Sequence, residues 1–207
     1  MPDADDAAPL DPSPPGGTGP AALAARTHLA ILFVDLSDST RLSGVMEAET
    51  FAAMLDDVKR ICRQAIQARR GILNQFQGDG LQAVFGHPAP TEHDGQHAVE
   101  AALEIHAGVR ALRQGLVAAG AGDLSVHSGL HAGPALVRPG DDMSGHLELF
   151  GPVPGIAKHL SDLALADELL ASEESLGPDL QQFDCEPTRH LAIKGRAQPL
   201  AVRRILA

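Results

Sequence analysis

Two aspartates are the residues whose positions in this 207-residue chain suggest chemistry. Asp35 directly follows the apolar run HLAILFV, and Asp79 precedes Gly80 in the run QGDG, between two short extended segments. A carboxylate at the end of a buried strand and another at a hairpin tip could converge on divalent cations, because Mg²⁺ prefers hard oxygen ligands together with substrate phosphates. Two such ions about 4 Å apart orient an attacking oxygen and stabilise a leaving phosphate. The pair is therefore the first candidate for a catalytic metal site.

The segment after Asp35 could bind phosphate. Residues 36–40, Leu-Ser-Asp-Ser-Thr, can present backbone N–H groups and hydroxyls to phosphate oxygens just before a helix. The same residue types also have ordinary structural uses, because Asp-x-x-[ST] caps helices and Asp-Gly forms turns. Each short motif alone is a hypothesis, and their combination along the chain carries more weight.

Alternating strands and helices must position these residues. The periodicity predicts strands over 28–34, 71–76, 81–85, 147–150, 189–194 and 199–205, an extended run around 126–130, and helices over 51–66, 98–116 and 156–165. Asp79-Gly80 predicts a hairpin between the second and third strands. Strands and helices thus alternate along the chain, with one antiparallel hairpin among them. This pattern favours an α+β fold built as an α/β sandwich.

Composition excludes several classes of function. The 16 Lys and Arg stand against 27 Asp and Glu, a net charge of −11, so a nucleic-acid polymer is a poor partner. Neither a membrane-spanning apolar stretch nor a secretory signal is evident, so no membrane partner and a cytoplasmic location are expected. Residues 1–27 are rich in Pro, Gly and Asp and predict a disordered tail, which leaves 28–207 as one domain.

Several blocks in order along the chain resemble the class III adenylate and guanylate (nucleotidyl) cyclase catalytic domain. The blocks are FVDLSDST, QGDGLQAVFG, FGHPAPTEHDGQHAVEAAL, HSGLHAG, FGPVPGIAKHLSDLA and LAIKGRAQPLAVRRIL. The resemblance implies a ferredoxin-like βαββαβ palm with additional C-terminal strands that works as a dimer. It also implies an enzyme that converts a nucleoside triphosphate to a 3′,5′-cyclic nucleotide and pyrophosphate at the dimer interface. ATP is the expected substrate.

The resemblance also implies residue roles. Two Mg²⁺ or Mn²⁺ ions would bind at Asp35, Leu36 and Asp79. Lys194 or Arg196 would reach the terminal phosphates of the nucleotide. The triphosphate would also contact Ser37, Asp38, Ser39 and Thr40.

Four positions depart from the family pattern. The two positions that read the base fall on Gln75 and Glu148, and neither the adenine pair nor the guanine pair of the family is reproduced. The Asn that orients the ribose becomes Gly155, and the Arg that stabilises phosphate charge becomes His159. Gly has no side-chain donor, whereas a protonated His159 would replace Arg in part as the catalytic cation.

Three interpretations follow. The chain is a working cyclase, either as a homodimer or as a heterodimer with a cyclase-like chain that supplies the missing groups. Alternatively, it is a degenerate pseudo-cyclase that binds nucleotide or acts as a scaffold. The third interpretation is another metal-dependent phosphotransferase on the same palm, such as a cyclic-dinucleotide synthase, although no GGDEF-like run is present. The histidines His93 and His97 have a zinc-like spacing, but a structural role is favoured because no HExxH motif accompanies them.

Overall fold

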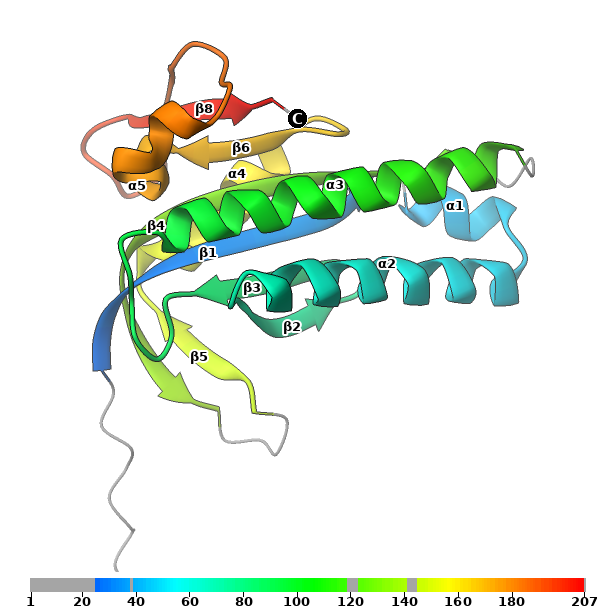
Figure 1. Ribbon diagram of the computed structural model, residues 1–207, viewed down its shortest axis with the longest axis horizontal. Coiled ribbons are helices and arrows are strands. Elements are labelled where there is room, and N and C mark those ends of the chain that lie inside the picture. The colour runs from blue at the N-terminus through cyan, green and yellow to red at the C-terminus, as the bar shows by residue number, and fades with distance from the viewer. Residues whose placement is uncertain (1–24, 38, 119–122, 141–144, 207) are drawn as a thin grey trace, which may run out of the picture.

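One mixed eight-stranded sheet with helices on both faces forms the protein (Figure 1). The computed structural model describes residues 25–37, 39–118, 123–140 and 145–206. The elements in chain order are β1 (Ala25–Ser37), α1 (Ser39–Val45), α2 (Ala48–Ala68), β2 (Ile72–Gln77), β3 (Gly80–Phe85), α3 (Asp94–Ala118), β4 (Ser125–Pro139), β5 (Leu147–Phe150), α4 (Pro152–Leu163), β6 (Leu169–Ser172), α5 (Glu173–Leu176), the 3₁₀ helix η1 (Gly177–Gln182), β7 (Arg189–Leu191) and β8 (Leu200–Ile205). No helix within these ranges has the length and apolar character needed to cross a membrane.

The first four long strands form the predicted palm. Strands β4, β1, β3 and β2 lie side by side in that order, β1 is antiparallel to both of its neighbours, and α2 and α3 connect the strands as a βαββαβ unit. The sheet continues from β4 through β6 and β8 to β7, while β5 pairs with the far end of β4. The α+β fold, the palm and the additional C-terminal strands are therefore confirmed.

Strand β1 runs through the middle of the core and is buried on both faces. Ala30, Leu32 and Val34 pack into the cluster formed with α2 and α3, whereas Leu29, Ile31 and Phe33 pack with α4. Successive side chains of a strand point to opposite faces. Asp35 therefore follows Phe33 on the face covered by α4, away from α2 and α3 in the front of Figure 1.

Several boundaries differ from the predictions. Strand β1 begins at Ala25, because Ala25 to Thr27 already pair with β4; residues 1–24 of the predicted tail lie outside the described residues. Helix α4 begins at Pro152, since Pro is favourable in the first helical turn. Strand β6 was not expected, because four buried residues between two neighbouring strands leave no alternating pattern.

Candidate functional site

Asp35 and Asp79 line the same small cavity. In the β1–β3 register Val34 pairs with Leu81, so Asp35 lies at the end of β1 beside the turn that carries Asp79. Both residues border a cavity of about 10 Å³ between the sheet and α2, although the Asp35 carboxylate lies on the opposite face, where Lys158 of α4 contacts it. A Cβ added at Gly80 would lie 2.9 Å from Asp35 Oδ1, so the start of β3 closely approaches the Asp35 side chain. Asp35 and Asp79 thus border one cavity, and the Asp35 carboxylate itself contacts Lys158.

The donor set at this cavity fits a hard divalent cation. Asp35 and Asp79 supply two carboxylates, and the apolar Leu36 side chain is buried, so Leu36 can contribute only through its backbone. The Leu36 N–H donates to Asp35 Oδ1 at 3.1 Å and helps to orient that carboxylate. In the described part of the chain no cluster of three or more His, Cys, Asp or Glu side chains is formed. The remaining ligands would be water and substrate phosphate, which is the usual arrangement for Mg²⁺.

Lys158 of α4 reaches the same aspartate. Its ammonium lies 3.2 Å from Asp35 Oδ2 and 2.7 Å from Asp162 Oδ1, one helical turn further along α4. Partial burial disfavours the charged ammonium, but the hydrogen bonds to Asp162 and Asp35 outweigh this effect and raise the pKa of Lys158. Sequence reasoning did not identify this residue, although its i,i+4 spacing from Asp162 indicated an ion pair on α4.

The predicted phosphate-binding segment lies at the end of β1 and in α1. The Ser37 hydroxyl is hydrogen-bonded to His127 Nδ1 of β4 at 3.1 Å. Ser39 and Thr40 lie in the first turn of α1, and the Thr40 carbonyl accepts a hydrogen bond from Ser43 Oγ. Asp38 lies outside the described residues.

A second cavity brings together the residues at the altered ribose and phosphate positions. Its volume is about 430 Å³, and its lining includes Gly155, His159, Lys194 and Arg196. Gly155 has open space where a side chain would be, and His159 is exposed on α4. The Arg196 guanidinium, however, is already paired with the Glu174 carboxylate at 2.6 Å.

A third cavity contains the two positions assigned to base reading. It measures about 540 Å³ and is lined by Gln75, Glu148 and neighbouring residues of β3 and β5. Glu148 is not free, because the Arg138 guanidinium donates to it at 2.9 Å and lies 4.6 Å from the centroid of the Phe150 ring. Sequence reasoning missed Arg138, since only the β4–β5 register places it opposite Glu148.

Asn74 fixes the wall of this third cavity. Its side-chain amide donates to Gln82 Oε1 at 2.7 Å and to the Leu147 carbonyl at 3.0 Å, and its Oδ1 accepts from the Leu147 N–H at 2.7 Å. These bonds connect β2 to β5, which are not neighbours in the sheet. The three cavities therefore separate the predicted residues into a carboxylate group, a ribose and phosphate group, and a base group.

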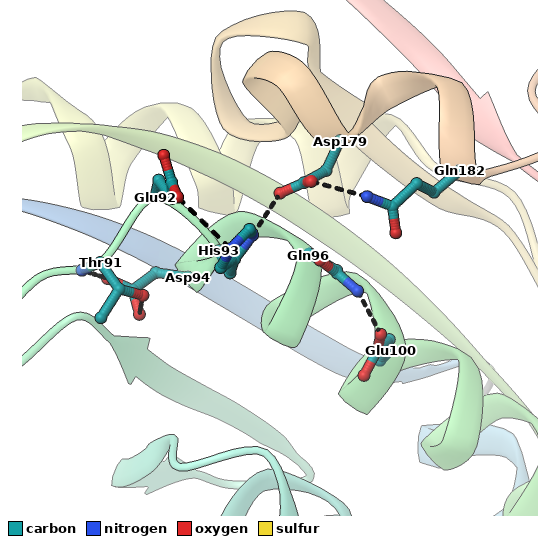
Figure 2. A network of polar contacts seen from close by, with 8 residues as sticks. All are labelled: Thr91, Glu92, His93, Asp94, Gln96, Glu100, Asp179 and Gln182. Carbon is teal, nitrogen blue, oxygen red and sulfur yellow. Dashed lines mark hydrogen bonds and ion pairs between the residues drawn. The ribbon is translucent and has the colours of Figure 1, made fainter.

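Other polar clusters have structural roles. Asp179 of η1 accepts one hydrogen bond from Gln182 at 2.7 Å. Its carboxylate also lies 3.2 Å from Nδ1 of His93, directly before α3, and this contact ties the start of α3 to η1 (Figure 2). Two further histidines are buried: His106 is 2.8 Å from the Ser128 hydroxyl, and His131 is 2.8 Å from that of Ser172. Burial lowers the pKa of each to about 4, so both are neutral near pH 7.

Comparison with known proteins agrees with this architecture. Residues 23–202 match the family model described as the adenylate and guanylate cyclase catalytic domain. The solved adenylyl cyclase CyaB from P. aeruginosa is similar with a TM-score of 0.82 and 24% identity, over 89% of this chain and 96% of that chain. The solved guanylyl cyclase Cya2 is similar with a TM-score of 0.80 and 20% identity, over 88% and 93% of the two chains. At these identities the structures show the shared fold.

Curated relatives match over shorter stretches of much longer proteins. Adenylate cyclase 1 of Rhizobium meliloti is 27% identical over 112 residues, which are 54% of this chain and 17% of the relative. An uncharacterized protein of the same organism is 29% identical over 169 residues, 81% of this chain and 15% of the relative. The chain thus spans about a sixth of the length of these relatives.

Proposed function

Because the chain belongs to the adenylate and guanylate cyclase catalytic domain family, we propose that it converts a nucleoside triphosphate to a 3′,5′-cyclic nucleotide and pyrophosphate. The single observation that carries this proposal is the position of Asp79, in the turn between β2 and β3, beside Asp35 of β1. The family match covers nearly the whole described chain, and the carboxylate pair keeps the chemistry that a phosphate-transferring metal site needs.

The residues divide the work of the reaction. Asp35, Asp79 and the Leu36 backbone would hold two Mg²⁺ or Mn²⁺ ions, which when bound neutralise phosphate charge and activate the attacking ribose oxygen. Ser39 and Thr40, together with Ser37 and Asp38, would contact the triphosphate. Lys194 and Arg196 would bind its terminal phosphates as charge-assisted donors.

The active site in this proposal is completed by a second chain. Gly155 and His159 line a different cavity from Asp35 and Asp79, and both are exposed. A partner copy, or a related chain that carries Asn and Arg at these two positions, would place them over the carboxylates. In a homodimer, His159 in its protonated form would stabilise phosphate charge with one positively charged ring where Arg offers a wider fork.

ATP is the first substrate to test. One relative of the chain is an adenylate cyclase, and Gln75 offers an amide that can both donate to and accept from a base edge. The Glu148 carboxylate is paired with Arg138 and is therefore less available to the base.

Pyrophosphate release tests the proposal. The full chain, alone and mixed with candidate partner chains, is incubated with each of the four nucleoside triphosphates and Mn²⁺ or Mg²⁺. We expect release that Asp35→Asn and Asp79→Asn each abolish, whereas Asp57→Asn, an exposed carboxylate on α2 that pairs with Arg60, leaves it unchanged. Absence of release from all four nucleotides under every pairing contradicts the proposal.

A pseudo-cyclase is the second candidate. It is favoured by one observation, that the ribose and phosphate cavity has no side chain at Gly155. Loss of one preorganised donor to the transition state commonly costs about 10²–10³ in rate. Nucleotide binding without turnover would identify a regulatory module, and absence of both would identify a scaffold.

A further inference from the structure

The side chain of Lys158 joins two carboxylates of different kinds. Asp35 lies in the cavity shared with Asp79, whereas Asp162 lies on the exposed side of α4. We propose that Lys158 is a resident competitor for divalent cations at Asp35, and that Asp162 holds its ammonium when a cation binds. This inference rests on the proposed function in one respect, the assignment of Asp35 as a metal ligand.

Helix α4 packs closely against the sheet beside Asp35. Ala157 and Leu160, on either side of Lys158, are completely buried, and the Ala157 carbonyl lies within 2.3 Å of where a Cβ at Gly129 of β4 would be. The helix backbone therefore rests directly on the sheet. The flexible Lys158 side chain, which is 39% exposed, is the part that can move.

The two ion pairs of Lys158 differ in length and in the elements that they join. The contact with Asp162 is the shorter, at 2.7 Å, and it lies within one helix at i,i+4 spacing. The contact with Asp35, at 3.2 Å, joins α4 to β1. When the Asp35 contact is lost, the Lys158 ammonium therefore stays paired with Asp162.

The surroundings of Asp35 contain room for a polar occupant. A cavity of about 60 Å³ is bordered by Asp35, Gly80, Lys158 and Ser161. Among the described residues, the Ser161 hydroxyl is the one buried side-chain polar atom that has no hydrogen-bond partner. A buried hydroxyl is normally satisfied by a protein group or by water. This hydroxyl gives the cavity beside Asp35 and Lys158 a polar atom to which a water can hydrogen-bond.

Electrostatics then sets the direction of the effect. An ammonium in contact with Asp35 neutralises part of the negative charge that attracts a divalent cation, and it repels a cation bound nearby. Removal of the Lys158 charge therefore tightens cation binding. Removal of the Asp162 charge leaves the ammonium with Asp35 alone and weakens cation binding.

Mn²⁺ binding to the full chain without nucleotide, followed by electron paramagnetic resonance of free Mn²⁺, tests the proposal without turnover. We expect Lys158→Met to lower the Kd for Mn²⁺ roughly tenfold, and Asp162→Asn to raise it roughly threefold. The double variant should bind like Lys158→Met alone, because Asp162 acts through Lys158. Lys158→Gln serves as a second neutral variant should the methionine variant fail to fold.

Lys59→Met is the matched control. Lys59 also borders the cavity of Asp35 and Asp79, but its ammonium lies over the Phe76 ring, 5.7 Å from the centroid. Lys59→Met changes the net charge by the same amount as Lys158→Met, and its effect on the Kd for Mn²⁺ should stay below about twofold. Equal effects of the Lys59 and Lys158 variants, or no change in Kd on loss of Lys158, overturn the inference.

Asp35→Asn separates the two proposals. Loss of Mn²⁺ binding in Asp35→Asn with no response to Lys158→Met leaves the proposed metal site intact and overturns only the role of Lys158. Unchanged Mn²⁺ binding in Asp35→Asn overturns both.

Discussion

Gly129 of β4 and Ser161 of α4 are in backbone contact. A Cβ added at Gly129 would lie 2.1 Å from the Ser161 backbone nitrogen and 2.3 Å from the Ala157 carbonyl oxygen. No side chain fits between the strand and the helix at this point. The contact fixes the height of α4 above the sheet, and with it the positions of Lys158 and His159.

Gly129→Ala tests this contact through stability. The added methyl meets backbone atoms that cannot rotate away, so we expect a loss of about 3 kcal/mol or more in the free energy of unfolding. Gly155→Ala in the same helix is the control, because the added methyl points to open space. This variant should raise the free energy of unfolding by about 0.5–1 kcal/mol. Urea denaturation measures both. A tolerated Gly129→Ala would mean that α4 can shift away from β4.

Restoration of the altered donors should raise turnover. Gly155→Asn fits sterically because the position is open, and His159→Arg places a charged fork in the same cavity. We expect the double variant to increase kcat for pyrophosphate release by about tenfold or more if the chain acts as a homodimer. No increase, with folding unchanged, would indicate that a different chain supplies these groups.

Release of Arg196 should improve binding of the triphosphate. In the structure the Arg196 guanidinium is held by Glu174, and the Glu174 carboxylate is about half exposed. Exposed ion pairs contribute about 0–1 kcal/mol, so Glu174→Gln should lower the KM for the nucleotide by up to about fivefold and leave kcat nearly unchanged. A change confined to kcat would argue against a role of Arg196 in phosphate binding.

Stability should decrease below pH 6.5. Burial lowers the pKa of His106 and His131 from 6.5 to about 4, so the unfolded chain takes up protons between these values and the folded chain does not. Each histidine should therefore remove about 1.4 kcal/mol from the free energy of unfolding between pH 7.5 and 5.5. Denaturation at the two pH values measures the loss.

The histidine variants provide the control for this pH dependence. His131→Gln and His106→Gln should each remove the part of the pH dependence that the replaced histidine contributes, whatever their effect on the free energy of unfolding at a single pH. The acidic groups whose pKa values are lowered, such as Glu100, contribute mainly below pH 4.5 and do not interfere in this window. An unchanged pH dependence in both variants would contradict the neutral state of these buried rings.

The fold was largely predictable because its strongest signals are local. The apolar run before Asp35 is β1, and Asp79-Gly80 forms the turn into β3. Strand β6 and the helix α1 were not predicted, because both are short and owe their form to neighbours distant in sequence. The position of Asp35 beside the turn of Asp79 followed the same rule, since it needed only one hairpin beside one strand.

Contacts made across the fold could not be read from the sequence. Lys158 contacts Asp35 although 123 residues separate them, and Arg196 is held by Glu174 across 22 residues. Arg138 faces Glu148 because of the β4–β5 register. Such pairs depend on tertiary packing and strand register, which residue types and spacing do not determine.

Lys158 and His159 are consecutive residues of α4, yet the first contacts the metal-site aspartate of its own chain and the second lines the cavity assigned to the nucleotide of a paired chain. In a dimer of the proposed kind, this helix would belong to two active sites at once. A cation that displaces Lys158 from Asp35 would act on the helix that also carries His159, and thermodynamic reciprocity requires any resulting coupling between the two sites to be equal in the two directions. Cation binding at one site and nucleotide binding at the other would then be a cooperative pair.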